Sequence, residues 1–314
     1  MISAKQTTLR ARATLSGAGV HSNAPVQVVL HPADADSGIV FLRTGLADGR
    51  DRTIRANWSE VSMTELCTVI GDASDATVAT IEHLLAALAG LGVDNALVEI
   101  DGPEVPIMDG SAAHFVEAID QVGVVQLNRP RRYVKVLKTV RVEHGRAFSE
   151  LRPAEQGFRL EVEIDFTQDI IGRQKKVIDL DPKTFRREIC RARTFGFVHD
   201  VERLWKAGFA LGASLENSVA LDESRILNPE GLRYADEFVR HKTLDAVGDL
   251  ALAGAPIIGA YRSYCGGHRT NVSVLKALFS DPEAYSIVEA PSRRLGGRSE
   301  LSLAAAAAYS PDLN

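Results

Sequence analysis

The sequence predicts an α+β protein built from two similar domains. In the first half, segments with the alternating pattern of strands precede two helical segments, an order that favours α+β over alternating βαβ units. After a basic stretch at residues 128–132, the same order of strands and helices recurs. This recurrence predicts two domains of one kind. We therefore expect domain I at residues 1–128, domain II at residues 129–300 and a C-terminal tail at residues 301–314.

Turn residues and apolar–polar alternation delimit the elements of the first half. Strands are expected at residues 13–15, 26–30, 38–42, 63–70 and 96–100. A helix is expected over residues 80–88, because leucine and isoleucine recur there at helical spacing, and Gly90 and Gly92 should end it. A proline-containing loop follows the last strand, and Ser111 should cap a second helix that runs to about Val122.

The second half is expected to begin after a linker at Asn128–Arg132, which is rich in arginine and contains proline. Strands are expected at residues 134–137, 140–143, 148–151, 159–164 and 175–178, and helices at residues 183–191, 201–207 and 234–252, before a final strand and helix. The alanine-rich tail is expected to fray.

Composition excludes several classes of protein. The chain has 314 residues with 36 Lys+Arg against 41 Asp+Glu, and this balance gives no strong field for nucleic acid. Cys67, Cys190 and Cys265 are widely spaced without a CxxC motif, so reduced thiols are expected. The sequence offers no signal peptide and no apolar run long enough for a membrane span. We expect a cytoplasmic protein.

Three polar side chains lie on one stripe of the helix expected at residues 234–252. His241, Asp245 and Asp249 follow one another at intervals of four residues, so they face the same side. A His and an Asp one turn apart suit zinc, which takes imidazole nitrogen and carboxylate oxygen at about 2.0–2.2 Å. The same spacing also occurs in solvated pairs that hold no metal. The stripe alone therefore leaves both interpretations open.

An upstream helix carries an adjacent acid and imidazole within an apolar run. Glu82 and His83 lie beside the leucine-rich face of that helix, at the edge of a buried surface. With His83, the possible ligands become two histidines and one aspartate. Three protein ligands with an open fourth position are typical of catalytic zinc, and Glu82 would be the neighbouring general base.

Residues 193–222 contain more large apolar side chains than a solvated loop. They are Phe195, Phe197, Leu204, Trp205, Phe209, Leu211 and Leu215. Such a segment suits core packing, which composition alone favours, or the wall of a passage for a hydrocarbon chain. His21 stands in a glycine-spaced loop at residues 16–22, and by itself it indicates little more than a turn.

Five motifs occur in one order along the chain. They are Thr80-Ile81-Glu82-His83-Leu84, Pro106-Ile107-Met108-Asp109-Gly110-Ser111, Arg191-Ala192-Arg193-Thr194-Phe195-Gly196, His241-Lys242-Thr243-Leu244-Asp245 and Gly267-His268-Arg269-Thr270-Asn271. Together they resemble the UDP-3-O-acyl-N-acetylglucosamine deacetylase family, zinc hydrolases of the committed step of lipid A biosynthesis in Gram-negative bacteria. The combination is specific although each motif is short.

The resemblance implies a fold and a set of residue roles. Each domain should pack a sheet against two helices, with the two helix layers facing each other around the active site. The implied zinc (Zn2+) ligands are His83, His241 and Asp245; the implied catalytic residues are Glu82 as general base, His268 as general acid, Thr194 as oxyanion donor and Asp249 as the carboxylate that holds His268. The implied substrate contacts are Lys242, Phe195, Phe197 and Met63.

The resemblance also implies an insert in each domain. One is a small strand element near residues 60–70, and the other is a strand–helix–strand element near residues 195–220 that encloses the acyl chain of the substrate. Two positions depart from the family pattern: His114 stands where proline is frequent, and Glu65 stands where an apolar residue is frequent.

The implied reaction is hydrolysis of the N-acetyl group of UDP-3-O-acyl-N-acetylglucosamine, which yields acetate and a free amine. A zinc peptidase would share the ligand chemistry, but the chain has no HExxH motif and a peptidase would not need an apolar insert. The alternative from another class is a non-catalytic protein that binds a UDP-sugar or lipid around a structural metal. Structural zinc usually has four ligands, often cysteine, so three non-cysteine ligands beside a glutamate favour catalysis.

Overall fold

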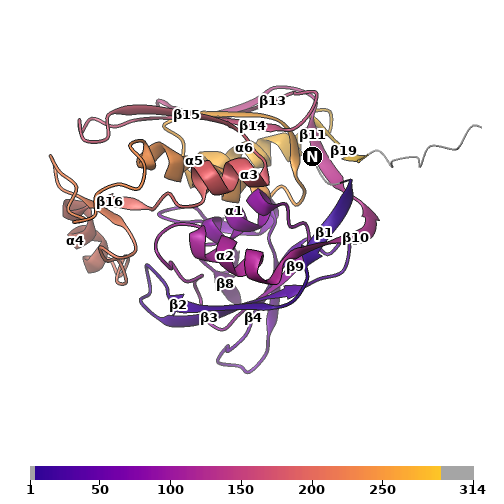
Figure 1. Ribbon diagram of the computed structural model, residues 1–314, viewed down its shortest axis with the longest axis horizontal. Coiled ribbons are helices and arrows are strands. Elements are labelled where there is room, and N and C mark those ends of the chain that lie inside the picture. The colour runs from indigo at the N-terminus through magenta and orange to yellow at the C-terminus, as the bar shows by residue number, and fades with distance from the viewer. Residues whose placement is uncertain (1–3, 291–314) are drawn as a thin grey trace, which may run out of the picture.

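Helices fill the space between two β-sheets in the computed structural model, which describes residues 4–290 (Figure 1). One sheet is built from the first third of the chain and the other from the second half. The helices of both parts meet between the sheets (Figure 1). The predicted α+β fold of two similar parts is confirmed by this arrangement.

The first sheet has the strand order β2-β3-β9-β4-β5. Its strands are β2 (Ala13–Ala18), β3 (Pro25–Pro32), β4 (Ile39–Arg43), β5 (Arg52–Arg55) and β9 (Ala96–Ile100). β4 runs parallel to β9, and the other neighbours are antiparallel. Along β3 the buried residues Val26, Val28 and Leu30 alternate with less buried ones, so one face of the sheet belongs to the core.

Helices α1 (Glu82–Leu91) and α2 (Ala113–Val122) cover the first sheet. Nearly every residue of α1 is buried, because this helix packs between the sheet and the helices of the second half. Gly92 ends α1 with a left-handed backbone conformation, φ 74°. Gly90 was also expected to end this helix, and that prediction is wrong: it lies inside α1, where the ring of Phe185 leaves no room for a Cβ.

The second sheet has seven strands. They are β11 (Arg132–Val136), β12 (Val140–His144), β13 (Ala147–Arg152), β14 (Phe158–Asp165), β15 (Arg173–Asp179), β18 (Ile257–Tyr264) and β19 (Tyr285–Glu289). β18 lies at the centre, parallel to β11 and β14 and antiparallel to β13. Helices α5 (Glu237–Ala251) and α6 (His268–Ser280) cover this sheet and face the first half of the molecule (Figure 1).

The stretch Asn128–Arg132 was expected to be a linker, and that prediction is wrong for its local structure. It contains the end of β10 (Val124–Pro130) and the start of β11. β10 pairs antiparallel with β1 (Lys5–Leu9), so its backbone groups are bound to a strand about 120 positions away in sequence, a partner that local composition does not reveal. The expected boundary between residues 128 and 129 falls inside β10.

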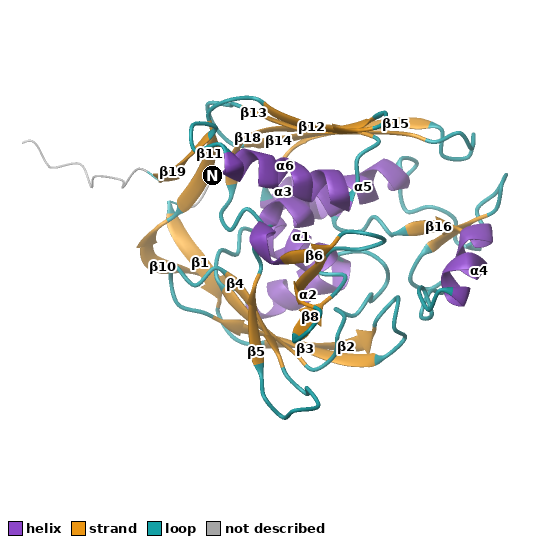
Figure 2. Cartoon of the chain, turned by 180° about the vertical axis from the view of Figure 1, so that it is seen from behind, coloured by secondary structure: helices purple, strands orange, loops and turns teal. Residues whose placement is uncertain are grey.

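Two small elements project from the main layers (Figure 2). The first is a three-stranded sheet of β6 (Val61–Met63), β7 (Val69–Asp72) and β8 (Ala76–Val78), so the single strand expected at residues 63–70 is two strands joined by a turn. The second consists of β16 (Phe195–Phe197), α4 (Val198–Lys206) and β17 (Val219–Leu221), with the two strands parallel.

The helix expected at residues 183–191 is shorter and irregular. A short α3 (Pro182–Thr184), capped by the Asp181 side chain, continues as a π-helical segment at Phe185–Ile189. The N-cap of α2 is Ala112, so the prediction that Ser111 caps this helix is wrong by one residue; the Ser111 hydroxyl accepts a hydrogen bond from the Ala113 N–H. The tail at residues 301–314 lies outside the described residues.

None of the helices in residues 4–290 combines the length and apolarity of a membrane-spanning helix, and the longest, α5, has 15 residues. Cys67, Cys190 and Cys265 are all unpaired thiols. Burial raises the pKa of Cys67 to about 12 and that of Cys190 to about 11, so both thiols are protonated at neutral pH.

Candidate active site

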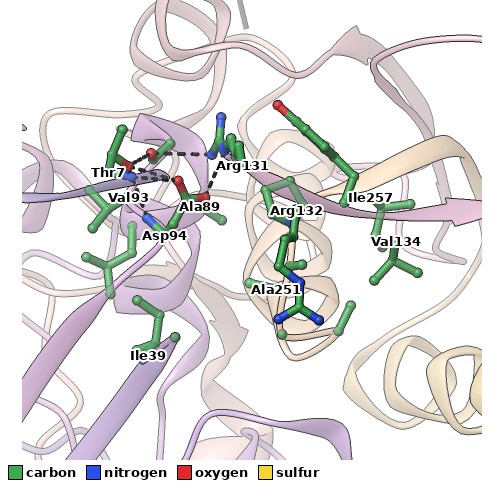
Figure 3. A pocket seen from close by; sticks show the side chains of 18 of the residues that line it. Thr7, Ile39, Ala89, Val93, Asp94, Arg131, Arg132, Val134, Ala251 and Ile257 are labelled. Carbon is green, nitrogen blue, oxygen red and sulfur yellow. Dashed lines mark hydrogen bonds and ion pairs between the residues drawn. The ribbon is translucent and has the colours of Figure 1, made fainter. Parts of the chain in front are cut away.

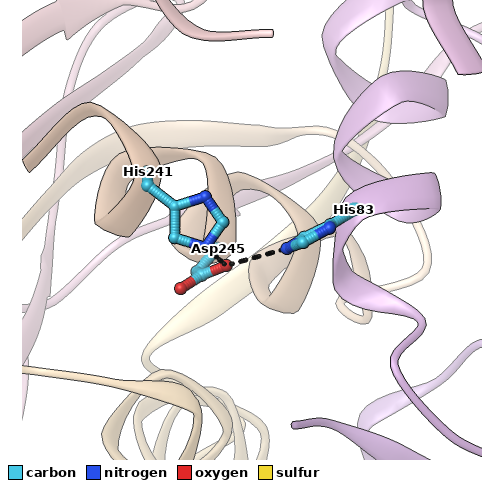
Figure 4. A group of neighbouring side chains, drawn as sticks. All are labelled: His83, His241 and Asp245. Atoms are coloured by element: carbon cyan, nitrogen blue, oxygen red, sulfur yellow. Dashed lines mark ion pairs between the residues drawn. The ribbon is translucent and has the colours of Figure 1, made fainter. Parts of the chain in front are cut away.

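His83, His241 and Asp245 form a buried cluster between α1 and α5 (Figure 4). One potential ligand atom from each residue lies within 4.8 Å of the others. The Oδ1 atom of Asp245 is 3.6 Å from Nε2 of His83 and 3.4 Å from Nε2 of His241. The two imidazole rings are nearly perpendicular, with centroids 5.1 Å apart. Three side chains from helices of different halves thus converge on one point.

The donors of this cluster suit a metal ion. Asp245 Oδ1 is buried and has no hydrogen-bond partner among residues 4–290, although the other oxygen accepts a bond from Lys242 Nζ at 3.0 Å. A buried carboxylate oxygen without a partner is costly unless a cation or donor satisfies it. Burial lowers the pKa of His241 to about 3, so its imidazole is neutral at pH 7, the form that ligates metals. Its Nδ1 bonds to the Ala192 carbonyl at 3.0 Å, which leaves Nε2 toward the cluster.

Glu82, His268 and Asp249 form a second group beside the cluster. His268 Nδ1 lies 2.8 Å from Asp249 Oδ2, and its Nε2 lies 3.8 Å from Glu82 Oε1. His268 begins α6, whereas Asp249 is one turn after Asp245 on α5 and Glu82 is adjacent to His83 on α1. The expected contact between Asp249 and His268 is therefore present in the structure.

The pKa values of Glu82 and His268 are both raised, for different reasons. Burial alone would lower the pKa of His268, but Asp249 and Glu82 overcome it and raise this pKa to about 10. Burial raises the pKa of Glu82 above its ordinary value, and His268 and His83 oppose that rise. His268 is therefore a cation at neutral pH that can give up a proton.

Thr68 connects both carboxylates, and sequence reasoning did not select it. Its backbone N–H donates to Glu82 Oε2 at 3.1 Å, and its hydroxyl donates to Asp249 Oδ1 at 2.6 Å. Asn271 Nδ2 donates to the other Asp249 oxygen at 2.8 Å. The only sequence signal was the presence of Asn271 within a recognised motif, and Thr68 lies in none of them. Their partners lie far away in the chain.

A second set of contacts fixes the segment that carries Thr194. The buried Arg193 donates from its backbone N–H and from Nε to Glu237 Oε1, both at 2.9 Å. Glu237 starts α5, one turn before His241. Thr194 N–H donates to the Gly110 carbonyl at 2.8 Å, and the Thr194 hydroxyl has no hydrogen-bond partner among residues 4–290. The hydroxyl is free to donate to a ligand.

Phe195 and Lys242 lie next to the metal-ligand cluster. The Phe195 ring is 6.2 Å from the His241 ring, and Lys242 Nζ is 5.6 Å from the centre of the Phe195 ring. Phe197 is buried in β16 and stacks on His199. Met63 ends β6 with 40% of its surface exposed, and none of the contacts within residues 4–290 joins it to the cluster.

The strand–helix–strand insert exposes large apolar side chains. α4 has no buried residue, and five apolar residues are 36–51% exposed: Val198, Trp205, Phe209, Leu211 and Leu215. The core interpretation that composition favoured is therefore wrong for Trp205, Phe209, Leu211 and Leu215. Exposed apolar side chains gathered on one small element are typical of a binding surface.

His21 also belongs to the surroundings of the site, although its loop alone indicated only a turn. Its backbone N–H donates to the buried Glu104 at 2.9 Å, and the Thr80 hydroxyl donates to the same oxygen. His21 Nδ1 accepts a bond from Ala210 N–H at 3.3 Å, so this loop is bound to the apolar insert. Burial lowers the pKa of His21, and the charge on His268 acts in the same direction.

The two departures from the family pattern lie at the surface. His114 is near the start of α2 and lies 3.7 Å from Glu117. Glu65 is exposed in the turn between β6 and β7. Neither residue contacts the metal-ligand cluster among the described residues.

Comparisons with known proteins agree with this geometry. The family described as LpxC, UDP-3-O-acyl N-acetylglycosamine deacetylase, matches residues 6–280. Curated proteins named UDP-3-O-acyl-N-acetylglucosamine deacetylase from Brucella ovis, Brucella abortus and Brucella melitensis are each 55% identical to the chain over 290 residues. Each comparison covers 92% of this chain and the whole of the relative.

Proposed function

The chain belongs to the UDP-3-O-acyl-N-acetylglucosamine deacetylase family, and we propose that its deacetylase activity depends on zinc held by His83, His241 and Asp245. The reaction of this family removes the N-acetyl group from UDP-3-O-acyl-N-acetylglucosamine in lipid A biosynthesis. Water adds to the acetyl carbonyl carbon, the amide C–N bond breaks, and acetate and the free amine of the glucosamine are the products.

The observation that carries the proposal is the unpartnered Oδ1 of Asp245. It is buried between two imidazoles, and only a cation or a donor from outside the described residues can satisfy it. Two histidines and one carboxylate leave a coordination position open, as in catalytic zinc sites. Zinc bound there would polarise the acetyl carbonyl and make water a better nucleophile at neutral pH.

The protein side chains divide the proton transfers between them. Glu82, beside His83, accepts a proton from the attacking water. His268, which keeps its proton at neutral pH, donates one to the departing amine nitrogen. The Thr194 hydroxyl donates a hydrogen bond to the oxygen on which negative charge develops. Asp249 fixes the tautomer of His268 through its bond to Nδ1.

The surroundings of the site match the two ends of the substrate. We propose that the exposed apolar residues of the insert, together with Phe197 and Met63, hold the acyl chain. Lys242 and Phe195, both next to the cluster, would contact the sugar–nucleotide part by charge and by packing. We also propose that the enzyme is monomeric and cytoplasmic, and its three unpaired cysteines fit a reducing compartment.

We also retain domains at residues 1–128 and 129–300 as part of the proposal. With this division, His83 comes from the first domain, whereas His241 and Asp245 come from the second. The metal would then be bound between domains.

The test measures zinc content and acetate release together. Asp245→Ala should lower both, because it removes one of three ligands, while circular dichroism should show an unchanged fold. A zinc-selective chelator should likewise stop acetate release by the unmodified protein, and added zinc should restore it.

Asp179→Ala is the matched control, since the Asp179 side chain is 74% exposed at the end of β15 and pairs with Arg159, not with the metal-ligand cluster. This variant should keep both zinc and activity. A full equivalent of tightly bound zinc in Asp245→Ala would refute the ligand assignment, whereas activity that resists chelation would refute zinc dependence without affecting the deacetylase assignment.

A further inference from the structure

A cavity of about 930 Å³ lies apart from the candidate active site, where the C-terminal ends of α1 and α5 meet the first residues of strands from both sheets (Figure 3). None of the proposed metal-binding or catalytic side chains lines it. Its apolar walls include Leu88 of α1, Leu250 of α5, Ile39 of β4 and Ile257 of β18. Its volume falls within the range of sites that bind small molecules, about 300–1,000 Å³.

The carboxylates that line this cavity already have partners. Asp36 accepts a hydrogen bond from Gln6 at 2.8 Å and forms an ion pair with Arg129 at 3.1 Å. Asp94 is paired with Arg131 at 2.8 Å. Asp181 caps α3 by accepting backbone N–H groups. The negative charges of the lining are therefore satisfied within the protein.

Three cations of the same lining have no such partner. The side chains of Arg55, Arg132 and Lys183 make no hydrogen bond and no ion pair within residues 4–290. Arg132 extends from β11 into the cavity (Figure 3), and its charge helps to lower the pKa of Asp36 without a direct bond. The cavity thus combines apolar walls with unpaired positive charge.

We propose that this cavity binds an amphipathic anion, with a single hydrocarbon chain against the apolar walls and a carboxylate or phosphate head group at Arg55 and Arg132. Guanidinium groups bind both kinds of head group with charge-assisted hydrogen bonds. Burial of the hydrocarbon chain against the apolar walls removes it from water, which favours binding. Neither part of the ligand would bind as well alone.

The occupant would contact the two helices that carry the proposed metal ligands. Leu85 lies two residues after His83 on α1, and Val247 lies two residues after Asp245 on α5. Two residues span about 200° around a helix, so these cavity-lining side chains face away from the ligands. An anion in the cavity and the substrate at the metal centre therefore occupy different places, and they should not compete.

The test is isothermal titration of the full chain with octyl phosphate and with octanoate. At least one should bind with 1:1 stoichiometry, and the tighter one identifies the preferred head group. Inorganic phosphate, which lacks the chain, and 1-octanol, which lacks the charge, should bind much more weakly. Equal binding of 1-octanol, or no binding of either anion, would overturn the proposal.

Variants of the lining residues test whether the ligand binds in this cavity. The double variant Arg55→Gln/Arg132→Gln should weaken binding by about tenfold for each arginine, with an unchanged kcat/KM for deacetylation. Ala251→Met should weaken binding by filling the cavity without altering the charge. Arg12→Gln, which changes an exposed arginine outside the lining, is the control and should bind like the unmodified chain. Binding that the substrate displaces, or that the double variant retains, would overturn the proposal.

Discussion

His268 and Glu82 must be in opposite protonation states for the proposed reaction, and their environments determine the pH range in which this occurs. Asp249 and Glu82 raise the pKa of His268 to about 10 against the effect of burial, so the acid form persists at neutral pH and is lost as pH rises through that pKa. Burial raises the pKa of Glu82, so the base form is lost as pH falls. A bell-shaped profile of kcat/KM against pH follows.

His268→Ala should remove the basic limb of that profile, and Glu82→Ala should remove the acidic limb. Each substitution should lower the rate by about 10²–10⁴, the usual contribution of a general acid or base. pH–rate profiles of both variants test this, with His114→Ala as a control on an exposed histidine that does not contact the metal-ligand cluster. Near-normal turnover in His268→Ala would show that this residue has only a structural role at the start of α6.

Thr68 contacts both carboxylates but would not touch the substrate, so its role is positioning. Thr68→Val keeps the shape and the backbone bond to Glu82 but removes the hydroxyl that binds Asp249. We expect kcat to fall while KM stays constant, and the unfolding free energy to drop by about 1–3 kcal/mol because a buried carboxylate loses a donor. Thr68→Ser should retain most of the kcat and most of the unfolding free energy, because serine keeps the hydroxyl. Equal losses in the serine and valine variants would indicate a packing role for the methyl group instead.

At the scale of elements, the contact between α1 and α5 sets the distance between the proposed base and the metal ligands. A Cβ at Gly248 would clash with the carbonyl oxygen of Glu82. Gly248 therefore permits the close approach of the two helices.

Gly248→Ala should reduce both stability and activity, although alanine is favoured over glycine in a helix by about 1 kcal/mol. Intrinsic helix propensity predicts that the substitution raises the free energy of unfolding, whereas packing predicts that it lowers it. Urea unfolding of the variant decides between them. A stabilised variant with normal kcat would show that the helices can separate without affecting the site.

The apolar insert makes a separate prediction about substrate length. Each buried methylene contributes about 0.8 kcal/mol, so kcat/KM should fall about fourfold for each methylene removed from the O-acyl chain. Leu211→Asn should weaken this dependence. Leu137→Asn is a matched control, because both leucines are 46% exposed and Leu137 lies just after β11. Equal kcat/KM for long-chain and acetyl-length substrates would contradict the proposed passage.

For the whole molecule, the sequence predicted the bounds of individual strands and helices better than it predicted how the strands pair into sheets. The strands at residues 96–100 and 140–143 and the helix at residues 234–252 were expected close to their observed bounds, because apolar periodicity and turn residues are local signals. β10 was mistaken for a linker because its partner, β1, lies at the other end of the first half. β19 was not expected, although it forms an edge of the second sheet.

The same limit applies to the site. The i, i+4 spacing of His241 and Asp245 is visible in the sequence, but the approach of His83 depends on the packing of two helices about 160 positions apart. Thr68 and Glu104 were missed because threonine and glutamate occur at many surface positions, and only the folded chain shows that these two are buried beside Asp249 and His21. The resemblance to a family supplied the roles that periodicity could not.

A metal ion bound between α1 and α5 would stabilise the whole molecule, because its ligands come from both halves of the chain. A ligand that binds only the folded state adds about 2.7 kcal/mol to the unfolding free energy at 100 times its Kd. A chelator should therefore lower the Tm of the unmodified chain, and Asp245→Ala should already have the lower Tm and be insensitive to the chelator. Asp179→Ala should respond to chelation as the unmodified chain does. Differential scanning calorimetry with and without zinc measures this, and a Tm of the unmodified chain that is independent of zinc would contradict a metal bound tightly by both helices.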